Sequence, residues 1–429
     1  MLVCRRAIPW LLAATLPAAN AVGQGAPERL TLDECLRRAL ASHPSTAVAR
    51  AQTDIASLGV RQAKAAFLPQ ARLDGAFTYN TPSSQAPDLP TYVALNGVRE
   101  YLALASVSVE LDTSGRLRAG RAKADADLAA ARAGAGITER DLKRQVVGAY
   151  YRVLLADHLA ASARDAVAEA IAFEERVKLL FGGGEAALAD VVKAATQTAF
   201  LEQAAASAAL DAETARHELL AFWTTDVAAP VELADDLEAS PPEPPPPPAE
   251  DAPYLRRPEM ALFGAQKDGF LAASRRTRDD RRPQLSATFQ YGFDALHLDS
   301  PERGWAAFVT LGIPVFDWSA GKNAARQLEL QADQVEATRR GAERLYSKEY
   351  QDALSRVRSL HAQIEGTRSQ RSLSEENLRL SRIRYEGGEG PALDVLAAQT
   401  QLAQARANLY TTLARYLESR ADLELASGR

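Results

Sequence analysis

The sequence predicts a mainly α-helical protein with a small β part, built from two internal structural repeats. Three observations predict this fold. A glycine-rich motif occurs twice, two stretches of about 65 residues lack proline, and four stretches of about ten residues alternate apolar and polar side chains. The long stretches indicate antiparallel coiled-coil helices, and the alternating stretches indicate four β-strands.

The N-terminal residues have the pattern of a secretory signal peptide, which we expect to cover residues 1–21. Arg5 and Arg6 precede a short apolar core, and Ala19-Asn20-Ala21 offers the small residues that a signal peptidase recognises. The alternative is a buried N-terminal helix. No other run of 18 apolar residues occurs, so any membrane-spanning segments of the mature chain would be strands.

A proline-rich segment, residues 238–253, lies near the middle of the chain and contains five consecutive prolines from Pro244. Such a composition favours an extended spacer, with a ligand for a proline-binding domain as the alternative. The segment separates a first repeat, residues 22–237, from a second repeat, residues 254–429. Matches between the two include Pro44 with Pro258, and the motifs FLPQ (67–70) and RRPQ (281–284).

Each repeat shows the same order of elements: a helix, two alternating strands, a long helix and a returning helix. A loop rich in proline, glycine, aspartate and asparagine separates the two strands. The expected ranges are 31–66, 70–80, 101–111, 113–180 and 186–222 in the first repeat, and 253–280, 284–293, 305–315, 318–386 and 391–426 in the second.

The strands and the long helices together favour a transmembrane β-barrel, with Tyr79, Tyr101, Tyr291 and Trp305 as possible interface aromatics. A soluble hairpin packed on one face is the alternative. An open strand edge in lipid leaves backbone groups unpaired, and four strands cannot close a barrel. A membrane form therefore requires several copies in closed symmetry.

The repeated motif places Gly183 and Gly184 in correspondence with Gly387 and Gly388, 204 positions later. Glycine reaches positive φ without strain, so we interpret both motifs as turns between an outgoing and a returning helix. A phosphate-binding loop is excluded, because no strand precedes FGGGE and no Gly-Lys-Ser/Thr follows it.

Composition and residue spacing give no sign of catalysis. The net charge of −5 and the lack of a basic cluster argue against nucleic-acid binding. Ser286 and Ser319 lie in strand or turn contexts without a nearby base, and the histidines are scattered without metal-ligand spacing. We therefore expect no enzyme, no cofactor and no metal site. The histidines are His43, His158, His217, His297 and His361.

These motifs resemble the TolC-like outer-membrane efflux proteins over nearly the whole mature chain. The resemblance rests on LTLDECLRRALASHP, FLPQ, RRPQ and RYEGGEGPALDVLAAQTQLAQARANLY. It implies a homotrimer in which four transmembrane strands per chain form a 12-stranded β-barrel above a periplasmic α-barrel. It also implies an exit duct for tripartite drug or metal efflux or for type I secretion, working with a periplasmic adaptor and an inner-membrane transporter.

The resemblance assigns roles at the helix turns. Tyr385 matches the gating tyrosine of the family, and Asp190 matches its carboxylate partner. The glycines of both turns match the adaptor-docking region. Gly390 stands where well-known members carry an arginine, so the latch is weaker or built differently.

Asp394 matches the position that lines the constriction of the family's pore. Threefold symmetry would make it a ring of three carboxylates that favours cations. The residue type alone leaves another role open, that of a helix N-cap or first-turn acid.

Two other classes remain open from the sequence. One is a periplasmic adaptor with a coiled-coil hairpin, although adaptors usually have one hairpin and this chain has two. The other is a soluble exported coiled-coil scaffold without a channel, which would not require strand faces that alternate as cleanly as those of QLSATFQYGF.

Overall fold

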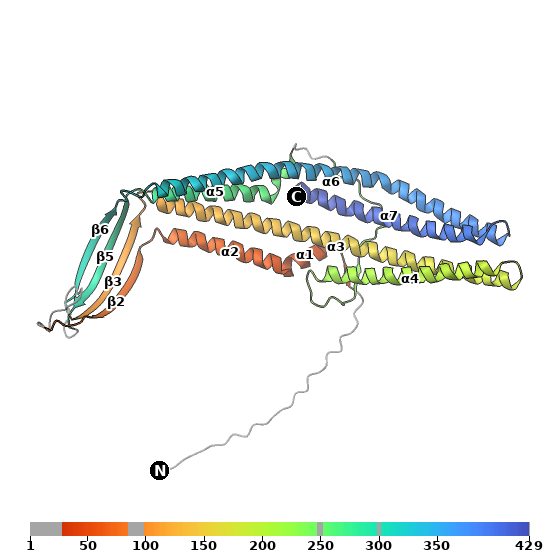
Figure 1. Cartoon of the computed structure of the whole chain (residues 1–429), viewed down its shortest axis with the longest axis horizontal. Coiled ribbons are helices and arrows are strands. Elements are labelled where there is room, and N and C mark those ends of the chain that lie inside the picture. The colour runs from red at the N-terminus through yellow and green to blue at the C-terminus, as the bar shows by residue number, and fades with distance from the viewer. Residues whose placement is uncertain (1–27, 85–97, 247–251, 298–301, 429) are drawn as a thin grey trace, which may run out of the picture.

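The computed structural model describes residues 28–84, 98–246, 252–297 and 302–428 of the chain. The expected signal peptide, residues 1–21, lies outside the described residues. The molecule is elongated, with a β-sheet at one end and two turns between long helices at the other (Figure 1). The elements between these ends hold the turns far from the sheet.

Four long helices form two antiparallel pairs. Helix α3 (Arg116–Gly182) returns as α4 (Leu188–Leu220), and α6 (Ala320–Glu386) returns as α7 (Ala392–Ala426). Helices α3 and α6 have 67 residues each, which at 1.5 Å per residue makes each about 100 Å long. Contacts between α3 and α7 join the two pairs within the chain.

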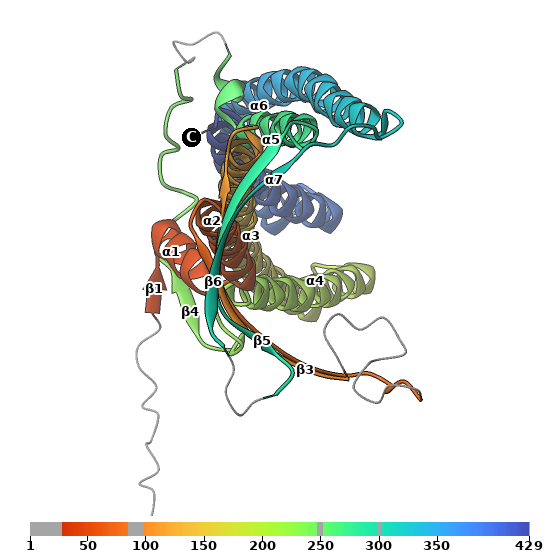
Figure 2. The same cartoon turned by 90° about the vertical axis from the view of Figure 1, so that its left-hand side faces the viewer.

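Two shorter helices fill the space beside the long ones near the sheet. Helix α2 (Pro44–Ala65) packs on α3, and α5 (Pro258–Asp279) packs against both α3 and α6 (Figures 1 and 2). Beyond these short helices, α4 and α7 take their place beside α3 and α6 and continue the bundle to the turns (Figure 1).

Both leading helices are interrupted at a proline, where the sequence analysis expected continuous helices over 31–66 and 253–280. Helix α1 (Leu32–Ser42) ends before α2, and a 3₁₀ turn (Pro253–Arg256) precedes α5. Proline disfavours helical φ and ψ for the residue before it. Accordingly, His43 is extended and its ring nitrogen accepts a hydrogen bond from the Ser45 amide at 3.3 Å.

The four predicted strands form one antiparallel sheet in the order β2-β3-β5-β6. Their bounds are β2 (Gln70–Tyr79), β3 (Arg99–Leu111), β5 (Gln284–Ala295) and β6 (Gly304–Gly312). The strand expected over 305–315 ends at Gly312, and Pro314, which follows, has no N–H for the ladder. The two central strands come from different halves of the chain, and β2 and β6 are the edges.

A second, two-stranded sheet was not predicted. It pairs β1 (Glu28–Leu30) with β4 (Val231–Leu233) in parallel. The segment after β4 is held against the helices through tyrosine hydroxyl groups: Tyr150 donates to Asp235 at 2.6 Å, and Tyr410 donates to Glu238 at 2.7 Å. These bonds fasten the start of the proline-rich segment to α3 and α7.

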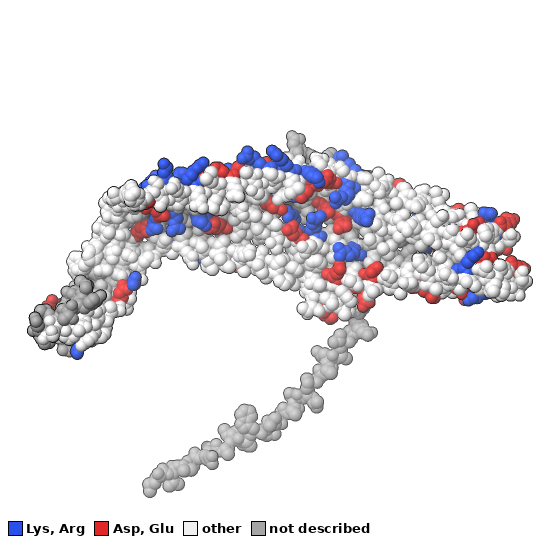
Figure 3. All heavy atoms as spheres, in the orientation of Figure 1, with Lys and Arg blue, Asp and Glu red and all other residues white. Residues whose placement is uncertain are grey.

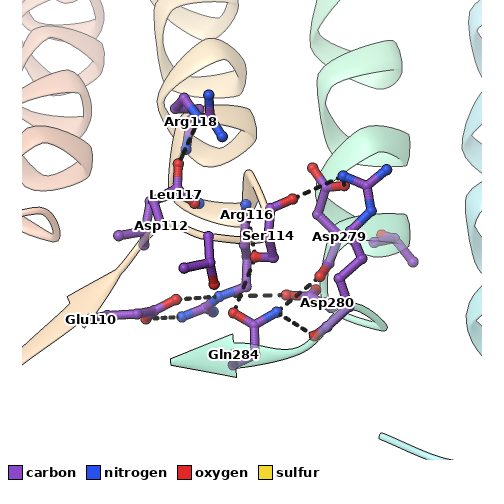
Figure 4. Close-up of polar contacts among 12 residues, drawn as sticks. Glu110, Asp112, Ser114, Arg116, Leu117, Arg118, Asp279, Asp280 and Gln284 are labelled. Carbon is purple, nitrogen blue, oxygen red and sulfur yellow. Dashed lines mark hydrogen bonds and ion pairs between the residues drawn. The ribbon is translucent and has the colours of Figure 1, made fainter. Parts of the chain in front are cut away.

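A polar network joins the strands to the long helices (Figure 4). The Asp112 carboxylate accepts hydrogen bonds from the amides of Leu117 at 2.9 Å and Arg118 at 3.2 Å. It thereby caps α3, whose N-cap residue, Gly115, has no side chain and a φ of 90°. Arg116 binds Glu110 of β3 and lies 3.7 Å from Asp280, so the network also links the two halves of the chain.

The second junction has the same design. Asp317 accepts hydrogen bonds from the amides of Ser319 and Gly321, each at 3.0 Å, at the start of α6. It also pairs with Arg281 at 3.1 Å. An aspartate thus satisfies the free amides at the start of both long helices.

We predict that Gly292→Ala disrupts the centre of the sheet. A Cβ at this position would overlap Ala103 O and lie 2.9 Å from Leu104 Cα, which are backbone atoms of β3. We expect a several-fold loss of folded protein, measured as heat-modifiable species on gels. Gly304→Ala is the matched control, since nothing lies within 4 Å of its Cβ. Equal yields of the two variants would contradict the close approach of β5 to β3 at Gly292.

We predict that the charge of Asp112 makes the stability of the protein depend on pH in the acidic range. Burial of the carboxyl raises its pKa, but hydrogen bonds from Leu117 and Arg118 outweigh burial, and the pKa lies below 3.8. The stabilisation is therefore complete well above pH 3.8 and is lost as the pH falls through the folded-state pKa.

The test is thermal unfolding of wild type and Asp112→Asn between pH 3 and pH 7. Asparagine keeps a capping oxygen but loses the charge, so we expect a loss of about 0.3–1 kcal/mol at pH 7 that shrinks toward pH 3. A loss that is independent of pH would show that the charge has no role.

Candidate functional site at the helix turns

The two turns at the far end of the molecule have the same geometry. The amide of Glu185 donates to Leu180 O, and that of Glu389 donates to Arg384 O, each at 2.8 Å. Gly183 and Gly387 are the C-caps of α3 and α6 with helical φ, whereas Gly184 and Gly388 have φ of 80° and 74°. The second glycine of each pair is therefore the one that requires positive φ.

Each returning helix carries an aspartate as its third residue, Asp190 in α4 and Asp394 in α7. An acid in the first turn interacts favourably with the helix dipole. Asp190 pairs with Lys193 at 3.3 Å. Asp394 is half-buried, and Pro391 holds the N-cap position, so Asp394 is a first-turn acid rather than the cap.

Tyr385 lies at the end of α6 and is 9% exposed. Its ring packs edge-on against Phe173 of α3, with ring centroids 5.3 Å apart. Its hydroxyl has no hydrogen-bond partner among the described residues. Burial, followed by the nearby charge of Asp190, raises the pKa of Tyr385. The structure thus brings Tyr385 and Asp190 near each other without a hydrogen bond between them.

An apolar cluster surrounds Tyr385 and joins the two helix pairs. It combines Phe173 and Val177 of α3 with Val395, Leu396 and Leu402 of α7. Phe173 was not among the site residues predicted from the sequence. The spacing of Phe173 and Val177, four residues apart on one helix face, was the signal that could have found it.

Polar contacts also link the pairs near the turns. Arg176 of α3 lies 3.7 Å from Glu386, and Gln197 of α4 donates to Thr400 of α7 at 3.4 Å. Within the second turn itself, Arg384 donates to the carbonyl oxygen of Glu389 at 3.4 Å, beside Gly390. Figure 3 shows acidic and basic side chains together at this end of the molecule.

Within the described residues, no group of three or more His, Cys, Asp or Glu side chains could hold a metal ion. None of the described helices combines the length and the apolar character needed to cross a membrane.

The family model for outer membrane efflux proteins matches residues 35–224 and 254–429. The chain belongs to this family. The match covers the four strands of the larger sheet, the long helices and both turns. The protein therefore lies in the outer membrane, extends into the periplasm and serves efflux. An adaptor or a soluble scaffold is the poorer interpretation of the same features.

Comparison with individual proteins agrees with this assignment. The chain is 26% identical over 416 residues to the cobalt-zinc-cadmium resistance protein CzcC of Cupriavidus metallidurans, covering 93% of this chain and 90% of that protein. It is 28% identical over 121 residues to the outer membrane protein OprJ of Pseudomonas aeruginosa, covering 27% of this chain and 25% of that protein.

Solved structures show the same fold. The outer membrane channel CmeC of Campylobacter jejuni superposes with a TM-score of 0.84 at 16% identity, over 92% of this chain and 85% of that one. The outer membrane protein VceC of Vibrio cholerae gives 0.80 at 19% identity, over 92% of this chain and 96% of that one.

We predict that Phe173→Ala loosens the turn end. Phe173 is 6% exposed, and removing its ring leaves a cavity beside Tyr385, at a cost of about 3 kcal/mol. Phe181→Ala is the matched control on the same helix, because Phe181 is 44% exposed and its loss should cost under about 1 kcal/mol. Denaturant unfolding followed by circular dichroism measures both. Equal losses would contradict the packing described for the cluster.

Proposed function

We propose that three copies of this chain form a passive exit duct that conducts substrates from the periplasm to the outside. The four-stranded sheet carries this proposal. Its order places β2 and β6 at the edges, running in opposite directions. Beside β2 of a second copy, β6 would therefore continue the antiparallel alternation, and three copies would close a 12-stranded barrel without an edge.

The side chains of the edge strands support a lipid-facing sheet. Large apolar residues stand exposed on β2 and β6, among them Leu73 at 79% and Val309 at 76%. Trp305 of β6 and Tyr79 of β2, expected as interface aromatics, are 72% and 61% exposed, and Tyr291 of the central strand β5 is 48% exposed. In water, exposure of this apolar surface would cost about 25 cal/mol of free energy per Å². Lipid and a neighbouring copy would cover it.

The helices also present apolar side chains that need a partner. Val48, Ile55 and Leu58 are at least half exposed on α2, as are Val192 and Phe200 on α4. Packing against the helices of neighbouring copies would bury them and form the periplasmic α-barrel. In this assembly each repeat, residues 22–237 and 254–429, would supply two strands and one long helix pair.

The turns would form the closable entrance of this duct. A hydrogen bond from the Tyr385 hydroxyl to the Asp190 carboxylate would hold the entrance shut with about 1.5–3 kcal/mol. The unbonded hydroxyl and the nearby Asp190 support such a bond. Asp394 would form a ring of three carboxylates, and the glycines of both turns would contact a periplasmic adaptor that leads to an inner-membrane transporter.

Metal cations are the cargo we propose to test first. The relative that spans nearly the whole chain is a cobalt-zinc-cadmium resistance protein. A carboxylate ring on the conduction path would favour divalent cations over anions.

The test is the single-channel conductance of the mature protein in planar bilayers, with wild type compared to Asp394→Ala. We expect cation-selective pores in which Co²⁺ binds at the carboxylate ring as it passes and so blocks part of the current carried by K⁺. This block should be at least tenfold weaker in the variant, because the carboxylate ring is lost. Glu175→Gln, on the outgoing helix α3, serves as the control. A protein that never conducts would refute the duct, and an unchanged block would refute the role of Asp394.

A further inference from the structure

Glu169 of α3 contacts both helices of the second pair. Its carboxylate lies 3.6 Å from the Arg382 guanidinium of α6 and 3.5 Å from the Arg406 guanidinium of α7. Its carbonyl oxygen also accepts a hydrogen bond from the Gln399 side chain of α7 at 3.3 Å. One residue of the first pair is therefore bound by three side chains of the second.

Partial burial of this cluster strengthens the attraction between its charged groups. The side chains of Glu169, Arg382 and Arg406 are 27%, 37% and 17% exposed, and Gln399 is 4% exposed. One Nη atom of Arg382 is enclosed without a hydrogen bond, so the carboxylate of Glu169 is the charge that faces it. Partly buried charges are less screened than exposed ones, and without Glu169 two cations would lie side by side.

The cluster is specific to the junction between the pairs within one chain. At the 204-residue spacing of the repeats, Glu169 corresponds to Leu373, which is 68% exposed. Arg382 and Arg406 correspond to Lys178 and Glu202 of the first repeat, so the equivalent positions do not carry the same set of charges. The arrangement is thus not a general feature of these coiled coils.

Glu169 lies well away from the turn along α3. It precedes Gly183 by 14 residues, which corresponds to about 21 Å along α3. Between Glu169 and the turn lies the apolar cluster of Phe173 and Val177. Apolar contacts tolerate sliding, whereas a carboxylate held by two guanidinium groups from two helices fixes their position.

We propose that Glu169 is an electrostatic latch that holds the α6–α7 pair against α3 and so limits the separation of the two helix pairs. Its consequence for conduction rests on the proposed function, because separation of the pairs would widen the entrance at the turns. The latch itself is a property of the chain and can be tested without a pore.

The first test is hydrogen exchange of the purified protein, with wild type compared to Glu169→Gln. The variant keeps the shape of the side chain and its backbone carbonyl but loses the charge. We expect several-fold faster exchange of amides in residues 165–180 and 395–408. Arg406→Gln should act in the same direction, and the double variant should add little. Glu175→Gln, exposed on the same helix, should exchange like wild type.

The second test is the open probability of single channels at low and high salt. Wild type should open more often at high salt, because screening weakens the latch, whereas Glu169→Gln should open several-fold more often at low salt and respond less to salt. Unchanged exchange and unchanged opening in Glu169→Gln would overturn the latch. If wild type forms no pore, the proposed function fails, and the exchange experiment alone decides on the latch.

Discussion

Close packing of long helices through small side chains is the constraint on which the whole molecule depends. Alanine supplies many of the buried positions of α3, such as Ala126, Ala133 and Ala170. Alanine lets backbones approach each other and favours the helical state, so helices of about 100 Å stay together over their length. Large buried residues occur where another element must be attached: Tyr150 beside the two-stranded sheet, and Phe173 with Tyr385 near the turns.

Features encoded locally could be predicted from the sequence. The turns depend on Gly184 and Gly388, whose conformation few other residues adopt, and the four long strands show a period of two over about ten residues. Pro44 and Pro258 are matching positions of the two halves, but the helices predicted over 31–66 and 253–280 ran through them. Both prolines break a helix in the structure. The end of β6 before Pro314 was missed for the same reason.

Features that depend on distant partners could not be predicted in this way. Strands β1 and β4 have three residues each, too few for a period to show, and they lie about 200 positions apart. Glu169 is one acid among many on α3, and only the fold brings it to Arg382 and Arg406. The family resemblance pointed to Tyr385 and Asp190, but the aromatic contact with Phe173 required coordinates.

The pairing of β3 with β5 has a consequence for the biogenesis of the protein. These central strands belong to different halves, with Ala103 opposite Phe293, and α3 of the first half also packs on α5 of the second. Until the second half of the chain is available, the edge of β3 that pairs with β5 therefore stays unpaired in the β2–β3 hairpin. Contacts across so many residues form slowly. An open strand edge is a site at which chains aggregate, so the first half of this protein is more exposed to aggregation than the complete fold.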